Sequence, residues 1–194
     1  MEKVKKGVRY IVYGVIAAQI GMGIWWIIQN ITTIPRFGDS TEYIDLSQKL
    51  QLDEYRTILY PLILRIAIAV GNRIHVPFQT LVYLGQLALS FSSIYYVCRS
   101  QFVRDDKPEN WKKLLFYTLG IMTIPVINFL NLTILTDSLA LSFLLVILVQ
   151  IQRVWQSDRV NVGDVVVLVV AFLLEALVRA DRIYSCTLYL VVYS

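Results

Sequence analysis

The sequence predicts an all-α integral membrane protein, a polytopic helical bundle with juxtamembrane helices in the first outer loop. Hydrophobic residues make up 57% of the 194 residues, and the mean hydropathy is +0.60. Charged residues make up 16%, against about 25% in soluble domains. Long uncharged runs separate the charged segments. The chain is therefore expected to form a single transmembrane module of about five to six spans plus interfacial helices.

The first span is predicted at Tyr10–Ile28, after the basic segment "MEKVKKGVRY". This apolar run is longer than the apolar region of a signal peptide, and no small-residue cleavage site follows it. A retained signal anchor is therefore expected. Trp25 and Trp26 mark its far end, where amphipathic rings favour the membrane interface.

The polar segment Arg36–Asp53 follows and is expected to be helical in part, with Asp39 or Ser40 as its cap. Its predicted apolar stripe consists of Tyr43, Leu46 and Leu50.

The next segment, Thr57–Val70, is apolar but has Arg65 at its centre. A charge at the middle of a bilayer costs about 2.5–3.5 kcal/mol on insertion scales. An interfacial or re-entrant helix, with Arg65 reaching polar groups, is therefore expected instead of a simple span.

Four further spans are predicted at Pro77–Val97, Leu114–Phe129, Leu139–Ile151 and Val165–Val178, and another begins at Ile183–Ser194. Twelve helical residues reach about 18 Å, whereas the hydrocarbon core is about 30 Å thick. The chain is therefore expected to be the N-terminal part of a longer protein.

The basic residues predict a topology. With the N-terminus in the cytoplasm, eleven of the eighteen Lys and Arg residues lie on the cytoplasmic side, in short segments. The net charge of +4 is then explained by topology, and no nucleic-acid partner is expected. In this orientation Ser40 and Ser138 should be reachable from outside and Ser100 from the cytoplasm.

Three polar clusters share the outer face in this topology. They are Asp39/Glu42/Asp45, Asp137, and Arg179/Asp181/Arg182. Arginine offers a donor fork that matches phosphate. A carboxylate can accept a proton from a hydroxyl nucleophile or hold a divalent metal ion. These clusters therefore suit a phosphorylated lipid substrate.

Structural roles compete with this interpretation at each acid. Asp137 precedes an apolar helix, and capping that helix is the more common role for such a residue. Glu42 and Asp45 fit a solvated helix face, where Asp45 pairs with Lys49 at i,i+4.

The basic residues and Glu175 have alternatives too. Glu175 lies at i,i+4 from Arg179, so a pair is one reading, while an acid within a span is also a functional candidate. Arg179 and Arg182 can be interface anchors. His75 fits a helix boundary.

The order of these segments resembles the start of the membrane glycosyltransferases with the GT-C fold. That family includes protein mannosyltransferases and bacterial enzymes that glycosylate lipid A and cell-surface glycans. The resemblance is carried by Asp39, Tyr43 and Leu46 in "GDSTEYIDLSQKL", followed by "YRTILYPLIL". "LTDSLALSF" and "LVRADRIY" resemble a later turn and an Arg-containing helix end of the family.

The resemblance implies sugar transfer from a polyprenyl-phosphate-linked donor to an acceptor hydroxyl on the extracytoplasmic face, with inversion. It implies Asp39 as the general base, and a bacterial plasma membrane location. Some family members use a divalent cation such as Mg or Mn, for which Asp39 and Asp137 are the candidates. The implied substrate-binding residues are Glu42, Tyr43, Arg56, Asp137, Arg179 and Arg182.

The alternative is a non-catalytic membrane protein: a lipid-linked glycan flippase, a small transporter, an assembly subunit or an inactive GT-C fragment. A transporter should carry paired broken helices or polar residues at mid-membrane. In this sequence the charged groups gather at one interface, which favours chemistry or binding there.

Overall fold

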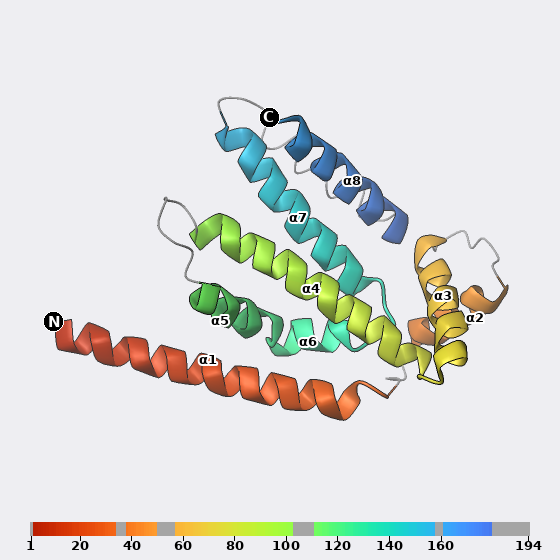
Figure 1. The fold of residues 1–194 in the computed structure, drawn as a ribbon, viewed down its shortest axis with the longest axis horizontal. Coiled ribbons are helices and arrows are strands. Elements are labelled where there is room, and N and C mark those ends of the chain that lie inside the picture. The colour runs from red at the N-terminus through yellow and green to blue at the C-terminus, as the bar shows by residue number, and fades with distance from the viewer. Residues whose placement is uncertain (1, 34–37, 50–56, 103–110, 158–160, 180–194) are drawn as a thin grey trace.

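In the computed structural model the described residues form helices and contain no strand (Figure 1). The structure describes residues 2–33, 38–49, 57–102, 111–157 and 161–179. The helices are α1 (Glu2–Asn30), α2 (Gly38–Lys49), α3 (Leu59–Ile74), α4 (Phe78–Phe102), α5 (Trp111–Met122), α6 (Pro125–Asn131), α7 (Asp137–Gln156) and α8 (Val162–Val178). The predicted all-α class is confirmed.

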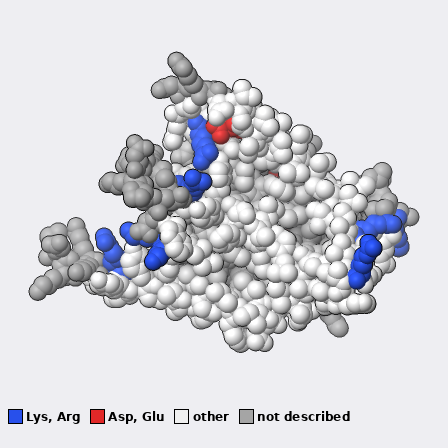
Figure 2. Space-filling model, viewed as in Figure 1, with Lys and Arg blue, Asp and Glu red and all other residues white. Residues whose placement is uncertain are grey.

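Three of these helices are long and apolar enough to cross a membrane: α1 over Gly7–Asn30, α4 over Phe78–Gln101 and α7 over Asp137–Gln156. Helices α1 and α7 each contain a predicted span, and α4 begins one residue after the predicted start at Pro77 and covers the rest of that span. Figure 2 shows Lys and Arg gathered at two ends of the visible face with an uncharged surface between them, as a bilayer requires. Helix α8 has 17 residues, about 26 Å of rise. The region 183–194 lies outside the described residues, so the count of five to six spans stays a prediction.

The predicted span Leu114–Phe129 is broken in the structure. Helices α5 and α6 meet at an angle of 77°, and together they are apolar enough to be a fourth, bent span. Pro125 is the cause, because it lacks an N–H and drives Ile124 into an extended conformation (φ −55°, ψ 131°). The Thr123 hydroxyl donates to the carbonyl oxygen of Leu119 (2.7 Å), a contact that bends helices.

Helix α1 packs against this break through a close backbone approach. The Gln19 amide donates to the Gly120 carbonyl oxygen (2.7 Å), and the Asn128 amide donates to that of Gly23 (3.1 Å). A Cβ atom on Gly23 would lie 2.5 Å from the Cβ of Thr123. Small residues that allow such an approach are typical of helix packing in membranes.

Replacing Gly23 by Ala is expected to loosen α1 from the bend. Overpacking of this kind costs about 1–3 kcal/mol, so the thermal midpoint of the purified protein in detergent should fall. Gly21→Ala in the same helix is the matched control, because a Cβ there meets nothing within 4 Å. It should leave the midpoint unchanged or raise it slightly, since Ala is the better helix former. Equal midpoints for the two variants would contradict the packing.

Helix α3 lies across the end of α4 instead of running alongside it (Figure 1). Its buried face comprises Tyr60, Pro61, Leu64, Ala67 and Gly71, whereas Arg65 is exposed. This amphipathic pattern is the one expected of an interfacial helix, although its position in a membrane stays a prediction. The helix ends at His75 in a left-handed conformation (φ 57°), which confirms the boundary role.

Helix α2 packs on α3 with a face that overlaps the predicted stripe at Tyr43, whose ring contacts that of Tyr60. Ser40 and Ser47 are its most buried residues, at 2% and 1% exposure, while Leu46 is half-buried. Tyr43 packs against the core as predicted, and Leu50 lies outside the described residues. Because Ser40 is buried, the expectation that it is reachable from outside is wrong.

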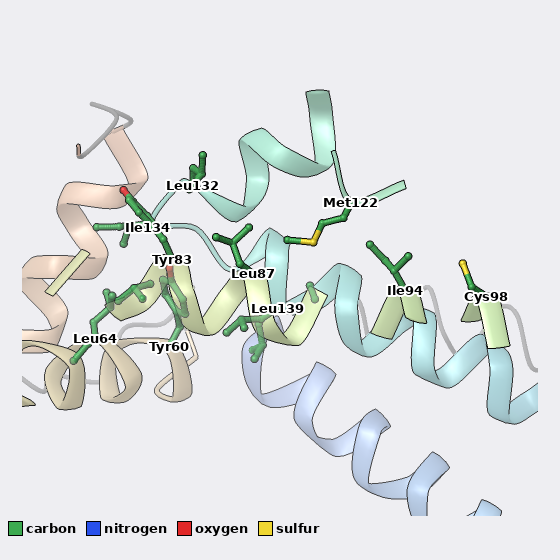
Figure 3. Close-up of a cluster of buried hydrophobic side chains, with 14 of the residues drawn as sticks. Tyr60, Leu64, Tyr83, Leu87, Ile94, Cys98, Met122, Leu132, Ile134 and Leu139 are labelled. Atoms are coloured by element: carbon green, nitrogen blue, oxygen red, sulfur yellow. The ribbon is translucent and has the colours of Figure 1, made fainter. Parts of the chain in front are cut away.

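The apolar core follows α4. Figure 3 shows it extending from Tyr83 through Leu87 and Ile94 to Cys98. Cys98 is buried and forms no disulfide, and Cys186 lies outside the described residues.

A polar network crosses this core between α4, α6 and α7. The Asn131 amide donates to the Ser90 hydroxyl (3.2 Å), and the Ser138 hydroxyl donates to the Asn131 side-chain oxygen (2.6 Å). All three residues are buried, so the expectation that Ser138 is reachable from outside is wrong. Buried polar side chains paired between helices are a common source of cohesion in membrane bundles.

Candidate functional site

The site forms where the start of α7, the end of α8 and the start of α3 meet (Figure 1). The Arg179 guanidinium donates to the Asp137 carboxylate, joining two residues that the sequence analysis singled out separately. Each side chain is 30% exposed, so the pair lies at the surface of the bundle and stays accessible to a ligand.

Thr57, just before α3, contacts the helix end that carries Arg179. The Thr57 hydroxyl donates to the carbonyl oxygen of Val178 (2.9 Å), the residue that precedes Arg179. Arg179 itself donates its backbone N–H to the Glu175 carbonyl oxygen (2.8 Å), which fixes the last turn of α8. The guanidinium is therefore held on an ordered helix end.

Tyr60 forms the buried base of the site. Its hydroxyl accepts a hydrogen bond from the Gln86 amide (3.1 Å), which also donates to the Leu135 carbonyl oxygen in the turn before α7 (3.3 Å). Burial raises the pKa of Tyr60, and the negative charge of Asp137 contributes in the same direction. Tyr60 therefore stays neutral and acts as a hydrogen-bonding and packing group.

Tyr43 connects α2 to this base. Its ring meets that of Tyr60 edge-on, with centroids 5.1 Å apart and an interplanar angle of 84°. Such pairs contribute about 0.5–1.5 kcal/mol beyond the area that they bury. Tyr60 thus contacts Tyr43 and lies within electrostatic range of Asp137, which in turn contacts Arg179.

The other predicted site residues lie apart from this centre or outside the described part. Asp39 is in the first turn of α2, and both Asp39 and Glu42 are exposed. They stand on the helix that carries Tyr43, at the same end of the molecule as the ion pair (Figure 1). Arg56 and Arg182 lie outside the described residues.

The expected cap role of Asp137 is corrected. The cap residue of α7 is Thr136, and the Asp137 carboxylate contacts Arg179. Glu175 is buried at 2% exposure within an apolar helix, a position where an acid is a functional candidate by default.

The donor set does not match a metal site. Within the described ranges, no three His, Cys, Asp or Glu side chains come together as ligands. A divalent cation in a protein site favours several oxygen ligands, whereas Asp137 contacts a guanidinium. We therefore derive no step through a metal ion.

Sequence reasoning missed Tyr60 and Gln86 as parts of the site. Tyr60 belongs to "YRTILYP", but its role depends on contacts with α2 and α4 that no local pattern reveals. Gln86 did carry a signal, because a glutamine inside an apolar span needs a partner for its amide.

Comparisons of this chain with protein-family models, with curated proteins and with solved structures found no match.

Proposed function

We propose that this chain is the membrane module of a GT-C-type glycosyltransferase in a bacterial plasma membrane, with its N-terminus in the cytoplasm. It transfers a sugar from a polyprenyl-phosphate-linked donor to an acceptor hydroxyl at the extracytoplasmic face, with inversion. The observation that carries the proposal is the Asp137–Arg179 pair at the ends of apolar helices. A guanidinium at that level can meet the phosphate of a lipid carrier.

The roles follow from chemistry. Arg179 steadies the departing lipid phosphate; because a guanidinium has five N–H donors, it can hold a carboxylate and a phosphate together. Asp137 orients that guanidinium. Asp39, exposed at the start of α2, accepts the proton of the acceptor hydroxyl, which attacks the anomeric carbon as the phosphate leaves. Glu42 and Tyr43 bind the substrate in this proposal. The resemblance also implies substrate-binding roles for Arg56 and Arg182, which lie outside the described residues.

Binding of a polyprenyl monophosphate tests the phosphate role. The full chain in lipid nanodiscs is titrated with this probe and bound lipid is counted by native mass spectrometry. Arg179→Gln should weaken binding about tenfold or more, the value of a charge-assisted hydrogen bond. Arg73→Gln is the control, because Arg73 is exposed on α3 and loses the same charge. Equal affinity of the wild type and Arg179→Gln would refute the phosphate role.

Cysteine labelling tests the orientation. Since Ser40 and Ser138 are buried, Asp45→Cys on α2 and Gln156→Cys at the end of α7 are the better reporters, because both positions are exposed. In a background without Cys98 and Cys186, a membrane-impermeant maleimide added to intact cells should label Asp45→Cys and spare Gln156→Cys until the cells are opened. Labelling of both positions from one side would contradict the topology.

A non-catalytic flippase or transporter is the second candidate, and the α5–α6 break is the observation that favours it. Broken helices beside buried polar groups such as Asn131 are found where substrates pass through membranes. The two candidates differ in products. A flippase moves the lipid-linked sugar intact, whereas the enzyme releases polyprenyl phosphate.

A further inference from the structure

A polar pocket lies between the last turns of α4 and α7, at the opposite end of α7 from Asp137. Its volume is about 470 Å³, within the range of small-ligand sites. Its lining includes Tyr96, Arg99, Ser100, Gln152, Arg153 and Gln156. Two cations and several neutral hydrogen-bonding groups therefore face one cavity, remote from the proposed transfer site.

Local contacts hold this pocket in shape. The Arg153 guanidinium stacks on the Tyr96 ring, 4.7 Å from its centroid. The Gln101 amide donates to the Gln152 side-chain oxygen (2.8 Å), which ties α4 to α7 beside the pocket. A guanidinium supported by an aromatic ring loses less side-chain freedom when it binds an anion.

The contact between Arg153 and the Asp164 carboxylate is weak enough for another anion to replace it. Asp164 Oδ1 lies 3.9 Å from Arg153 Nη1, beyond hydrogen-bond distance, and the two side chains are 31% and 42% exposed. Pairs of this kind contribute about 0–1 kcal/mol. A phosphate that makes direct hydrogen bonds to Arg153 can displace this contact.

The position of the pocket at the ends of two candidate membrane spans indicates which kind of anion it binds. Arg99 and Arg153 lie in the last turns of α4 and α7, which are both candidate membrane spans. The ends of spans lie at the level of lipid headgroups. Basic pockets between membrane helices are sites for acidic headgroups. We propose that this pocket binds the phosphate of an acidic phospholipid, through Arg99 and Arg153 with the Gln152 amide as a neutral donor.

The test titrates the detergent-purified full chain with dioleoyl-phosphatidylglycerol or dioleoyl-phosphatidylcholine, and native mass spectrometry measures bound lipid. Phosphatidylglycerol should bind more tightly than phosphatidylcholine. Arg99→Gln and Arg153→Gln should each weaken its binding about fivefold, the contribution of one basic residue near a membrane surface. Asp164→Asn should strengthen it about two- to fivefold, because it removes the competing charge.

The opposite sign of the Asp164→Asn effect separates binding from misfolding, since a damaged protein would not bind more tightly. Arg73→Gln, exposed on α3, should leave binding unchanged. Equal binding of the two lipids, or no effect of Arg99→Gln and Arg153→Gln, would overturn the proposal. Displacement of phosphatidylglycerol by excess inorganic phosphate at constant ionic strength would overturn the lipid as the ligand and assign the pocket to free phosphate.

Discussion

Replacing Asp39 by Asn is expected to reduce sugar transfer about 10²- to 10⁴-fold, the usual contribution of a positioned general base. Asp39 stands in the first turn of α2, where the helix dipole stabilises a negative charge and keeps the carboxylate able to accept a proton. Asn suits a helix start as well as Asp does, but its amide cannot take the proton. Stability should fall by no more than about 1 kcal/mol, the dipole contribution.

The measurement uses proteoliposomes that contain the full chain, a panel of polyprenyl-phosphate hexoses and pentoses, and a membrane extract as the source of acceptor. Release of polyprenyl phosphate reports transfer. Asp45→Asn is the matched control, since it removes the same charge from an exposed position of the same helix. If Asp39→Asn retains near-normal release, Asp39 has only its dipole role, and the base must be sought at Glu42 or Asp137.

The sequence predicts the long helices well because their signal is local. Helices α1, α4 and α7 each match one of the predicted spans to within one residue at its start or contain it whole, since length and apolar composition alone specify a membrane helix. The α5–α6 break was missed, although Pro125 was visible, because a proline can bend a membrane helix or merely be tolerated there. The close approach of Gly23 in α1 to Thr123, at the bend, is a contact between distant segments that the local sequence does not reveal.

The faces of helices were harder to predict than their positions. The predicted stripe of Tyr43, Leu46 and Leu50 suggested that large apolar side chains form the buried face of α2. In the structure, Ser40 and Ser47 are the most buried residues of this helix. Small polar side chains allow two helices to approach closely, and hydropathy alone reads such residues as exposed. Ser40 was expected to be exposed and is buried in the structure.

The sequence identified residues of the candidate site but not which of them contact one another. Asp137 and Arg179 were both singled out, yet local rules favoured a cap for Asp137 and offered Arg179 only Glu175 at i,i+4 or a role as an interface anchor. The two residues are separated by 42 positions, and periodicity carries no information at that range. Their contact depends on how α7 and α8 pack together.

A double-mutant cycle on Asp137→Asn and Arg179→Gln is expected to give a coupling free energy of about 1–3 kcal/mol between the two side chains. Each of the two side chains is 30% exposed. Exposed ion pairs contribute about 0–1 kcal/mol, and loss of one partner of a buried pair costs about 3–5 kcal/mol. The coupling free energy of Asp137 and Arg179 should therefore lie between these two ranges. Each single variant should lower the free energy of unfolding in detergent, and the double variant should lose less than the sum.

The pair Arg153 and Asp164 supplies the internal control. Its atoms are 3.9 Å apart and its side chains are more exposed on the arginine side, so its coupling should stay below about 1 kcal/mol and vanish as salt is raised. Equal coupling for the two pairs would contradict the geometry of the site.

Because Thr57 donates to the carbonyl oxygen of Val178, beside Arg179, loss of the Asp137 contact should also increase amide hydrogen exchange at the end of α8. The control variants should leave exchange at that end of α8 unchanged, since Asp164 stands in the first turn of α8, at its other end.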